Sequence, residues 1–188
     1  MSRIAPTEPA VYEAAFGSDA TNAEKVFAHA PEIAKAYLNF GAVAREHTKL
    51  PFRLVELVRL RVAFHNQCRL CMSLRYEGPE GEEALEEGLV CSLAKPYEAP
   101  DLSAAEVAAL AYADKMATDH LSINDATFDE LRKHFDNAQI MEFCLRVAAN
   151  VGFGRMAAVL DVIPQEELPD ELRGDGTVAP WELSVVSS

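Results

Sequence analysis

The stretch ELVRLRVAFHNQCRLC, residues 56–71, joins a helical apolar pattern to a closely spaced pair of cysteines. Leu57 and Leu60 belong to a broad apolar face whose three- and four-residue spacing predicts a helix. Asn66 is a residue type that caps helix N-termini well, so a second helix is expected over about 67–76. The sequence therefore predicts two consecutive helices, with the cysteine pair at the start of the second.

The helical period continues on both sides of this stretch. Pro31 suits the first turn of a helix, and Ser103 with Glu106 three residues later forms a capping box before an Ala-rich run. Gly152 and Gly154 would allow close packing of a late helix. Val and Ile occur mostly inside 3.6-residue patterns, so an all-α fold is predicted. Further helices are expected over residues 124–135 and 137–160.

Three segments are predicted along the chain. Residues 1–21 form an N-terminal arm with scattered Pro, Gly and Ser, and residues 22–162 form one helical domain. Residues 163–188 turn to Pro, acidic residues, Gly and Ser, so this tail is expected to be disordered or packed on a neighbouring subunit. Trp181 would be its anchor.

The composition restricts the class of protein. With 188 residues, 49% of them hydrophobic, the chain is long enough to bury a core. The net charge of −13 argues against nucleic-acid binding, which depends on Lys and Arg contacts to phosphates. No uninterrupted apolar stretch approaches the roughly 20 residues that span a bilayer, and the N-terminus lacks the pattern of a secretory signal. A cytoplasmic protein that binds neither nucleic acid nor membrane is therefore expected.

The chemistry concentrates on Cys68 and Cys71. Two intervening residues let the thiols close a small disulfide if their Cα atoms lie within roughly 7 Å. Early in a helix, unpaired N–H groups and the helix dipole favour a thiolate, and Arg69 and Arg75 add positive charge nearby. Such a thiolate can attack a peroxide, become a sulfenic acid and be captured as a disulfide. A redox pair is thus one interpretation, beside a metal site and cysteines that only pack.

The alternatives have less support in the sequence. Zinc needs four ligands, commonly with a second Cys or His pair at similar spacing, and the chain has no such pair. His65 is a third ligand or an auxiliary base under the functional interpretation, and a polar residue at a helix junction under the structural one. A thioredoxin fold would require a strand before the motif, where a helix is predicted instead. Neither a metal nor another cofactor is therefore expected.

Glu56 interrupts the apolar helix twelve residues before Cys68. In a structural interpretation it is an exposed acid that pairs with Arg59 or Arg53. In a functional one its carboxylate points into the pocket of the thiols and accepts or relays the proton that leaves a cysteine.

Glu56 followed by Cys68-x-x-Cys71 resembles the motif of the alkylhydroperoxidase-D-like branch of the carboxymuconolactone decarboxylase family, in its peroxidase-related part. The surrounding residues 57–63 and 66–67 and the segments 29–32 and 102–115 are also similar to that family. The resemblance covers roughly residues 5–162. It implies an all-helical domain that assembles into homotrimers or homohexamers, with the dithiol in a pocket built at a subunit boundary.

The resemblance also implies roles for the residues. Cys71 would attack the peroxide, Cys68 would resolve the product as a disulfide, and Glu56 would relay a proton. The partners would be a hydroperoxide or another small molecule and a lipoyl or protein dithiol as reductant. The family has a histidine where this chain has Arg75, and an arginine can stabilise a thiolate but cannot shuttle a proton.

Three functions follow from these residues. The first is an antioxidant oxidoreductase, a peroxidase or disulfide reductase that cycles Cys68 and Cys71 between dithiol and disulfide. The second is a carboxymuconolactone decarboxylase-like enzyme acting on a lactone, which would not need the cysteines. The third is a non-catalytic redox sensor, which Arg75 favours.

Overall fold

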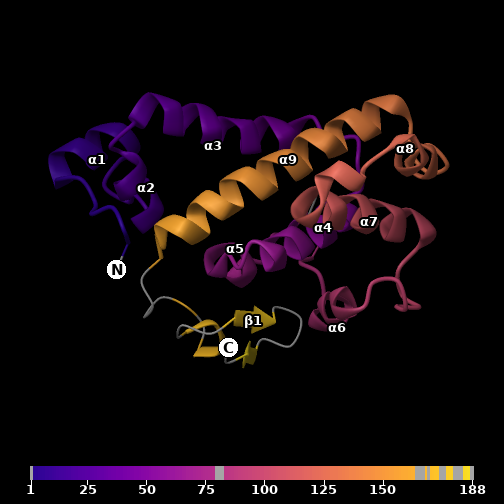
Figure 1. The fold of residues 1–188 in the computed structure, drawn as a ribbon. Coiled ribbons are helices and arrows are strands. Elements are labelled where there is room, and N and C mark those ends of the chain that lie inside the picture. The colour runs from indigo at the N-terminus through magenta and orange to yellow at the C-terminus, as the bar shows by residue number, and fades with distance from the viewer. Residues whose placement is uncertain are drawn as a thin grey trace.

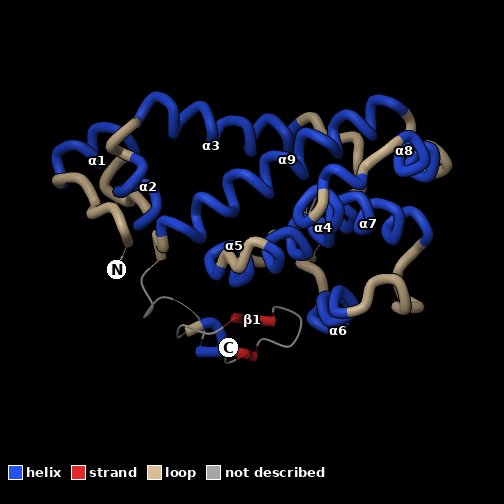
Figure 2. Tube along the Cα trace, in the orientation of Figure 1, coloured by secondary structure: helices blue, strands red, loops and turns tan. Residues whose placement is uncertain are grey.

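The computed structural model describes residues 2–78, 83–163, 168, 170–173, 177–179 and 184–186. Helices dominate these residues, as Figure 2 shows, and the described strands form one short hairpin near the C-terminus. The α-helices are α1 (Pro9–Phe16), α2 (Asn22–Phe27), α3 (Pro31–Glu46), α4 (Phe52–His65), α5 (Arg69–Ser73), α6 (Glu87–Cys91), α7 (Ala104–Thr118), α8 (Asp125–Leu131) and α9 (Asn137–Leu160). Short 3-10 turns are η2 (Ser92–Ala94), η3 (His120–Ser122) and η5 (Asp170–Leu172), and the strands are β1 (Thr177–Ala179) and β2 (Ser184–Val186).

Helix α4 lies at the centre of the core, between α7 and α9 (Figure 1). Its predicted apolar face is fully buried, with Leu57, Leu60 and Val62 all at 0% exposure. The residues that face it come from α7 and α9, and they include Ala109, Leu110, Ala113, Phe143 and Val147. The segment that carries Cys68 and Cys71 follows directly from this buried helix, so the core holds its first residues in place.

The predicted helix starts are confirmed where local chemistry decides them. Ser103 accepts from the Glu106 N–H while the Glu106 carboxylate accepts from the Ser103 N–H, which is the expected capping box at α7. Pro31 occupies the first turn of α3, and α9 spans the residues 137–160 predicted for it. The all-α fold class, with the cysteine pair at the start of a helix, is confirmed as well.

Two predicted helices are shorter than expected. The helix predicted over 67–76 is limited to α5, and its N-cap is Cys68, whereas Asn66 is the C-cap of α4. Gln67 causes this difference, because its φ of 51° lies in the left-handed region and cannot continue a right-handed helix. Helix α8 ends at Leu131, four residues before the predicted end.

The N-terminal segment packs on its own chain. It contains α1, and the Arg3 N–H donates to the carbonyl of Leu160 at the end of α9. Of the segment after residue 163, Leu168 and Leu172 are buried against Met72 and Ala63 of the same chain. Strands β1 and β2 pair antiparallel. Trp181, the expected anchor, lies outside the described residues.

Helices α3 and α9 share a largely exposed apolar face. Ala34 is the one buried residue of α3, while Phe40 and Val43 are exposed. Helix α9 is long and apolar enough to cross a membrane by length and composition, and only 22% of its most apolar window is buried. Figure 1 shows α3 running above α9 along much of its length. An open apolar hollow between the two helices is lined by Phe40, Leu145, Ala148, Ala149, Gly152, Phe153 and Met156.

Candidate active site

A sharp turn between α4 and α5 positions the first cysteine. Gln67 follows the end of α4 in a left-handed conformation, and its N–H donates to the carbonyl of Phe64 (2.9 Å). The Cys68 N–H then donates to the carbonyl of Ala63 (3.1 Å), so this hydrogen bond ties Cys68 to the last turn of α4. This turn places the cysteine pair against the core.

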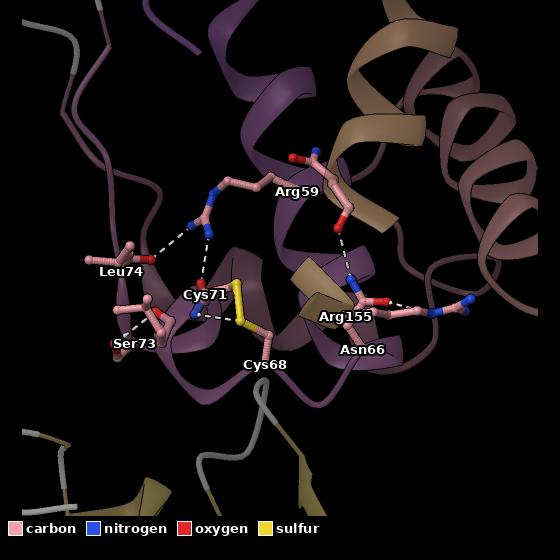
Figure 3. Close-up of a disulfide and its surroundings, with 9 residues drawn as sticks. Arg59, Asn66, Cys68, Cys71, Ser73, Leu74 and Arg155 are labelled. Carbon is pink, nitrogen blue, oxygen red and sulfur yellow. Dashed lines mark hydrogen bonds between the residues drawn. A yellow bond between two sulfur atoms is a disulfide. The ribbon is translucent and has the colours of Figure 1, made fainter. Parts of the chain in front are cut away.

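Asn66 fastens the same turn to α9. Its side-chain amide donates to the carbonyl of Asn150 (2.9 Å), and its oxygen accepts from Arg155 Nε (3.1 Å), as Figure 3 shows. A Cβ at Gly154 would lie 2.5 Å from the Asn66 amide nitrogen, so only glycine leaves room for this contact. The prediction that Gly154 allows close packing is confirmed. A Cβ at Gly152 would meet nothing within 4 Å, so that glycine has no such role in this chain.

Cys68 and Cys71 form a disulfide, with their Cα atoms 5.2 Å apart. The Cys71 N–H donates to Cys68 Sγ (3.2 Å), an interaction drawn in Figure 3. Cys68 is 1% exposed, whereas Cys71 is only partly buried. Cys71 is therefore the more exposed residue of the pair.

Glu56 is buried, at 2% exposure, and ion-paired with Arg59. Its Oε1 accepts from Arg59 Nη2 (2.6 Å) and its Oε2 from Arg59 Nε (2.7 Å). The Tyr76 N–H also reaches Oε1, at 3.4 Å. Of the two partners considered from the sequence, Arg59 is the correct one, since Arg53 pairs with Glu106 instead. The structural interpretation of Glu56 as an exposed acid was therefore wrong about its exposure, while its role as a proton relay stays a prediction.

Arg59 links Glu56 to the cysteine pair. Its Nη1 donates to the carbonyl of Cys71 (2.6 Å) and its Nη2 to the carbonyl of Leu74 (2.8 Å). Figure 3 shows the guanidinium between α4 and the end of α5. The sequence suggested Arg59 only as a partner for Glu56, because nothing local marks it as a ligand of a carbonyl twelve residues ahead.

Arg75, which stands at the histidine position of the similar family, forms a comparable contact. Its Nη1 donates to the carbonyls of Met72 (2.6 Å) and Leu74 (3.1 Å). Its Nε pairs with Glu87 of α6 (2.7 Å). The Arg75 guanidinium is therefore bound to backbone oxygens at the end of α5 and to a carboxylate of α6.

His65 belongs to a separate polar network. Its Nε2 lies 2.7 Å from Asp114 Oδ1 on α7, and Asp114 also accepts from Arg61 (2.7 and 3.0 Å) and from Tyr97 Oη (2.8 Å). Burial alone would raise the pKa of Asp114, but hydrogen bonds from His65, Arg61 and Tyr97 and the charge of Arg61 together hold it below its usual value. The network joins α4 to α7 and to the loop that carries Tyr97.

The described part of the C-terminal segment lies next to the cysteine helix. Leu168 and Leu172 are fully buried in a small cluster with Met72 and Ala63, and Cys71 packs against this cluster. The sequence did not predict this contact, because Leu168 and Leu172 are isolated apolar residues in an acidic and Pro-containing segment.

Among the residues that the structure describes, no three His, Cys, Asp or Glu side chains group in a way that could hold a metal ion.

Comparison with known structures identifies the class of fold. A peroxidase-related protein with an alkylhydroperoxidase AhpD core, from Ralstonia eutropha JMP134, superposes with a TM-score of 0.64 at 19% identity, over 91% of this chain and 94% of that one. The chain thus has the alkylhydroperoxidase-D-like fold.

Two further structures have the same fold. A protein of unknown function from Agrobacterium tumefaciens, proposed as an antioxidant defence protein of the AhpD type, has a TM-score of 0.61 at 22% identity. That match covers 72% of this chain and 92% of that one. A peroxidase-related protein from Silicibacter sp. TM1040 has a TM-score of 0.61 at 19% identity, over 79% of this chain and 78% of that one. No known protein-family profile matches the sequence, and no curated protein matches it either.

Proposed function

We propose that this protein is a thiol-dependent oxidoreductase that cycles Cys68 and Cys71 between dithiol and disulfide, as a peroxidase or a disulfide reductase. The observation that carries the proposal is the Cys68–Cys71 disulfide, in which Cys68 is buried and Cys71 is only partly buried. The alkylhydroperoxidase-D-like fold supports the same chemistry.

The proposed cycle starts at Cys71. Its thiolate attacks one peroxide oxygen, the O–O bond breaks, and the alcohol leaves with a proton while Cys71 becomes a sulfenic acid. Cys68 then attacks the Cys71 sulfur, water leaves and the disulfide forms. A small dithiol or a protein dithiol attacks the disulfide and restores both thiols, which supplies the two electrons that the peroxide consumed.

The proposal extends to the cellular location, the partners and the assembly of the protein. A reducing cytoplasm would keep the pair available for turnover, and a net charge of −13 suits neither nucleic acid nor an anionic membrane as a partner. The exposed apolar face of α3 and α9 supports assembly into a homo-oligomer, with a second copy as its occupant. Small residues such as Ala148 and Ala149 line the hollow and allow close approach of another helix.

The test is steady-state reduction of an organic hydroperoxide with dihydrolipoamide as electron donor. Turnover by the wild type is expected to fall by about 100-fold or more in Cys71→Ser. Cys68→Ser is expected to turn over more slowly than wild type, because no resolving thiol remains and dihydrolipoamide must attack the Cys71 sulfenic acid directly. Cys91→Ser, which changes a cysteine outside the pair, serves as the control and should retain full turnover. A Cys71→Ser variant as active as wild type would exclude the proposal.

A redox sensor is the second candidate. It is favoured because the Glu56 carboxylate is ion-paired with Arg59, and because Arg75, as an arginine, cannot shuttle a proton. A sensor would form the disulfide once with peroxide and show no multiple turnover. Arg75→His separates the two functions, since a gain of turnover in that variant would show that the wild-type chain lacks only the proton carrier.

A further inference from the structure

The carbonyl groups at the end of α5 depend on side chains for their hydrogen bonds. The last carbonyls of any helix lack partners within the helix, and α5 has only five residues. Arg59 binds the carbonyls of Cys71 and Leu74, and Arg75 binds those of Met72 and Leu74. Two arginines therefore hold the end of the helix that carries the more exposed cysteine.

Arg59 is the more rigid of the two. Its carboxylate partner, Glu56, is 2% exposed on the core helix α4, whereas the Glu87 side chain that pairs with Arg75 is 56% exposed. The Arg59 guanidinium also lies 4.7 Å from the centre of the Tyr76 ring. A guanidinium offers five N–H groups in a planar fork, and this fork reaches Glu56 and both carbonyls at once.

This arrangement affects the equilibrium between dithiol and disulfide. A helix of five residues is not stable by itself, so a free α5 would sample many conformations in the dithiol state. Closing the disulfide would then cost the entropy of bringing the cysteines into the permitted geometry. If α5 is already held to α4, that cost falls and the disulfide is favoured.

We propose that Arg59 is a positioning residue for Cys71, and that Glu56 acts through Arg59 by fixing its orientation. The proposal rests on the proposed function, in which the pair cycles between dithiol and disulfide. It assigns Glu56 a role in the redox equilibrium, which differs from the proton relay that the family resemblance implies. A proton relay would alter rates and leave that equilibrium unchanged.

The experiment measures the exchange of the protein with dithiothreitol. Protein dithiol and oxidised dithiothreitol give protein disulfide and reduced dithiothreitol, with two electrons and two protons transferred. Arg59→Lys keeps the positive charge beside Glu56, but one ammonium cannot reach the carboxylate and both carbonyls. We expect the equilibrium constant for disulfide formation to fall about tenfold, which corresponds to about 30 mV.

The matched control is Arg146→Lys in α9. Arg146 pairs with Glu142 of its own helix and donates to the carbonyl of Ala44, and its side chain is 12% exposed, against 13% for Arg59. Arg146 makes no bond to α5. The equilibrium constant for disulfide formation in Arg146→Lys should therefore stay within twofold of wild type. A merely structural role for Arg59 would lower the stability of both variants and leave both equilibrium constants unchanged.

The outcomes separate the two proposals. If the equilibrium constant for disulfide formation in Arg59→Lys lies within twofold of wild type and the cysteine pair still cycles, the positioning role is overturned. The proposed function then remains intact. A wild-type pair that does not interconvert in any dithiothreitol mixture removes the proposed function, and the positioning role with it. If Arg59→Lys does not fold, the neutral pair Glu56→Gln with Arg59→Gln removes the buried charges together, and it should show the same tenfold fall.

Discussion

At the scale of single residues, the backbone at Gln67 decides where the cysteine pair lies. A φ of 51° is tolerated by few residue types other than glycine, and β-branched side chains are the least suited to it. The side chain supports the turn as well, since its Nε2 donates to the carbonyl of Phe64 (2.9 Å). The conformation is therefore a local requirement of the site.

Gln67→Val is expected to destabilise the protein by about 1–2 kcal/mol, because valine is strained in the left-handed region. Gln67→Asn, which shortens the side chain by one methylene but tolerates this conformation, should cost less. Urea unfolding of both variants measures the difference. Equal stability of the two would show that the left-handed conformation is not what limits this position.

Asp114 makes the folded state sensitive to acid. Its pKa is held low in the folded protein, whereas it is near 3.9 in an unfolded chain, so the unfolded state takes up the proton first as the pH falls. The stabilisation is complete well above pH 4 and is lost progressively as the pH drops below that value.

Asp114→Asn should therefore destabilise the protein by about 3 kcal/mol at pH 7, since it leaves Arg61 without its charged partner. The difference from wild type should narrow below pH 4. Asp129→Asn, which removes an exposed pair with Arg132, is the control and should cost less than about 1 kcal/mol. Unfolding free energies at pH 7, 4 and 3 test this, and a gap that does not change with pH would contradict it.

At the scale of elements, the contact between α9 and the turn before α5 depends on Gly154. An added Cβ would lie 2.5 Å from the Asn66 amide nitrogen, so the Asn66 side chain, or the turn that carries it, would have to shift. Because Cys68 follows Asn66 by two residues, this movement would also reach the cysteine pair.

Gly154→Ala is expected to destabilise the protein by about 1–3 kcal/mol through overpacking, although alanine is the better helix former. Gly88→Ala in α6, where a Cβ meets nothing within 4 Å, should be neutral or slightly stabilising. Thermal unfolding compares the two variants. A stabilised Gly154→Ala would mean that the Asn66 contact yields at little cost.

At the scale of the whole molecule, the folded chain leaves apolar side chains of α3 and α9 uncovered around the hollow between the two helices. Phe40, Leu145 and Phe153 are exposed and line the hollow, and the two helices carry further exposed apolar side chains, namely Ile33, Leu38, Val43, Met141 and Val159. Helix α3 buries only Ala34 within the chain, so intrachain packing accounts for little of its stability. A second copy covering these side chains would supply the missing burial.

Leu145→Glu is expected to shift the protein toward monomer, because it places a charge in the apolar hollow of the assembled form. Leu121→Glu, at a residue that is 85% exposed in η3, should leave the mass unchanged. Sedimentation equilibrium gives the mass of each variant. A wild type that is monomeric at all concentrations would contradict the expected assembly.

The sequence by itself determined the features that arise from neighbouring residues. Helical periodicity and capping residues predicted the all-α fold, the start of α7 at Ser103 and the extent of α9, because these depend on interactions within a turn or two of the chain. The spacing of Cys68 and Cys71 likewise showed that a small disulfide was possible, and the structure contains it.

Only the tertiary structure decided what surrounds the cysteines. His65 meets Asp114 across 49 positions of the chain, and Arg59 holds a carbonyl 12 positions ahead. Leu168 and Leu172 are buried beside Met72 although their own segment predicts no core. Such contacts depend on how distant segments approach each other, and a local pattern carries no information about that distance. The candidate chemistry was thus present in the sequence, while its positioning emerged only from the fold.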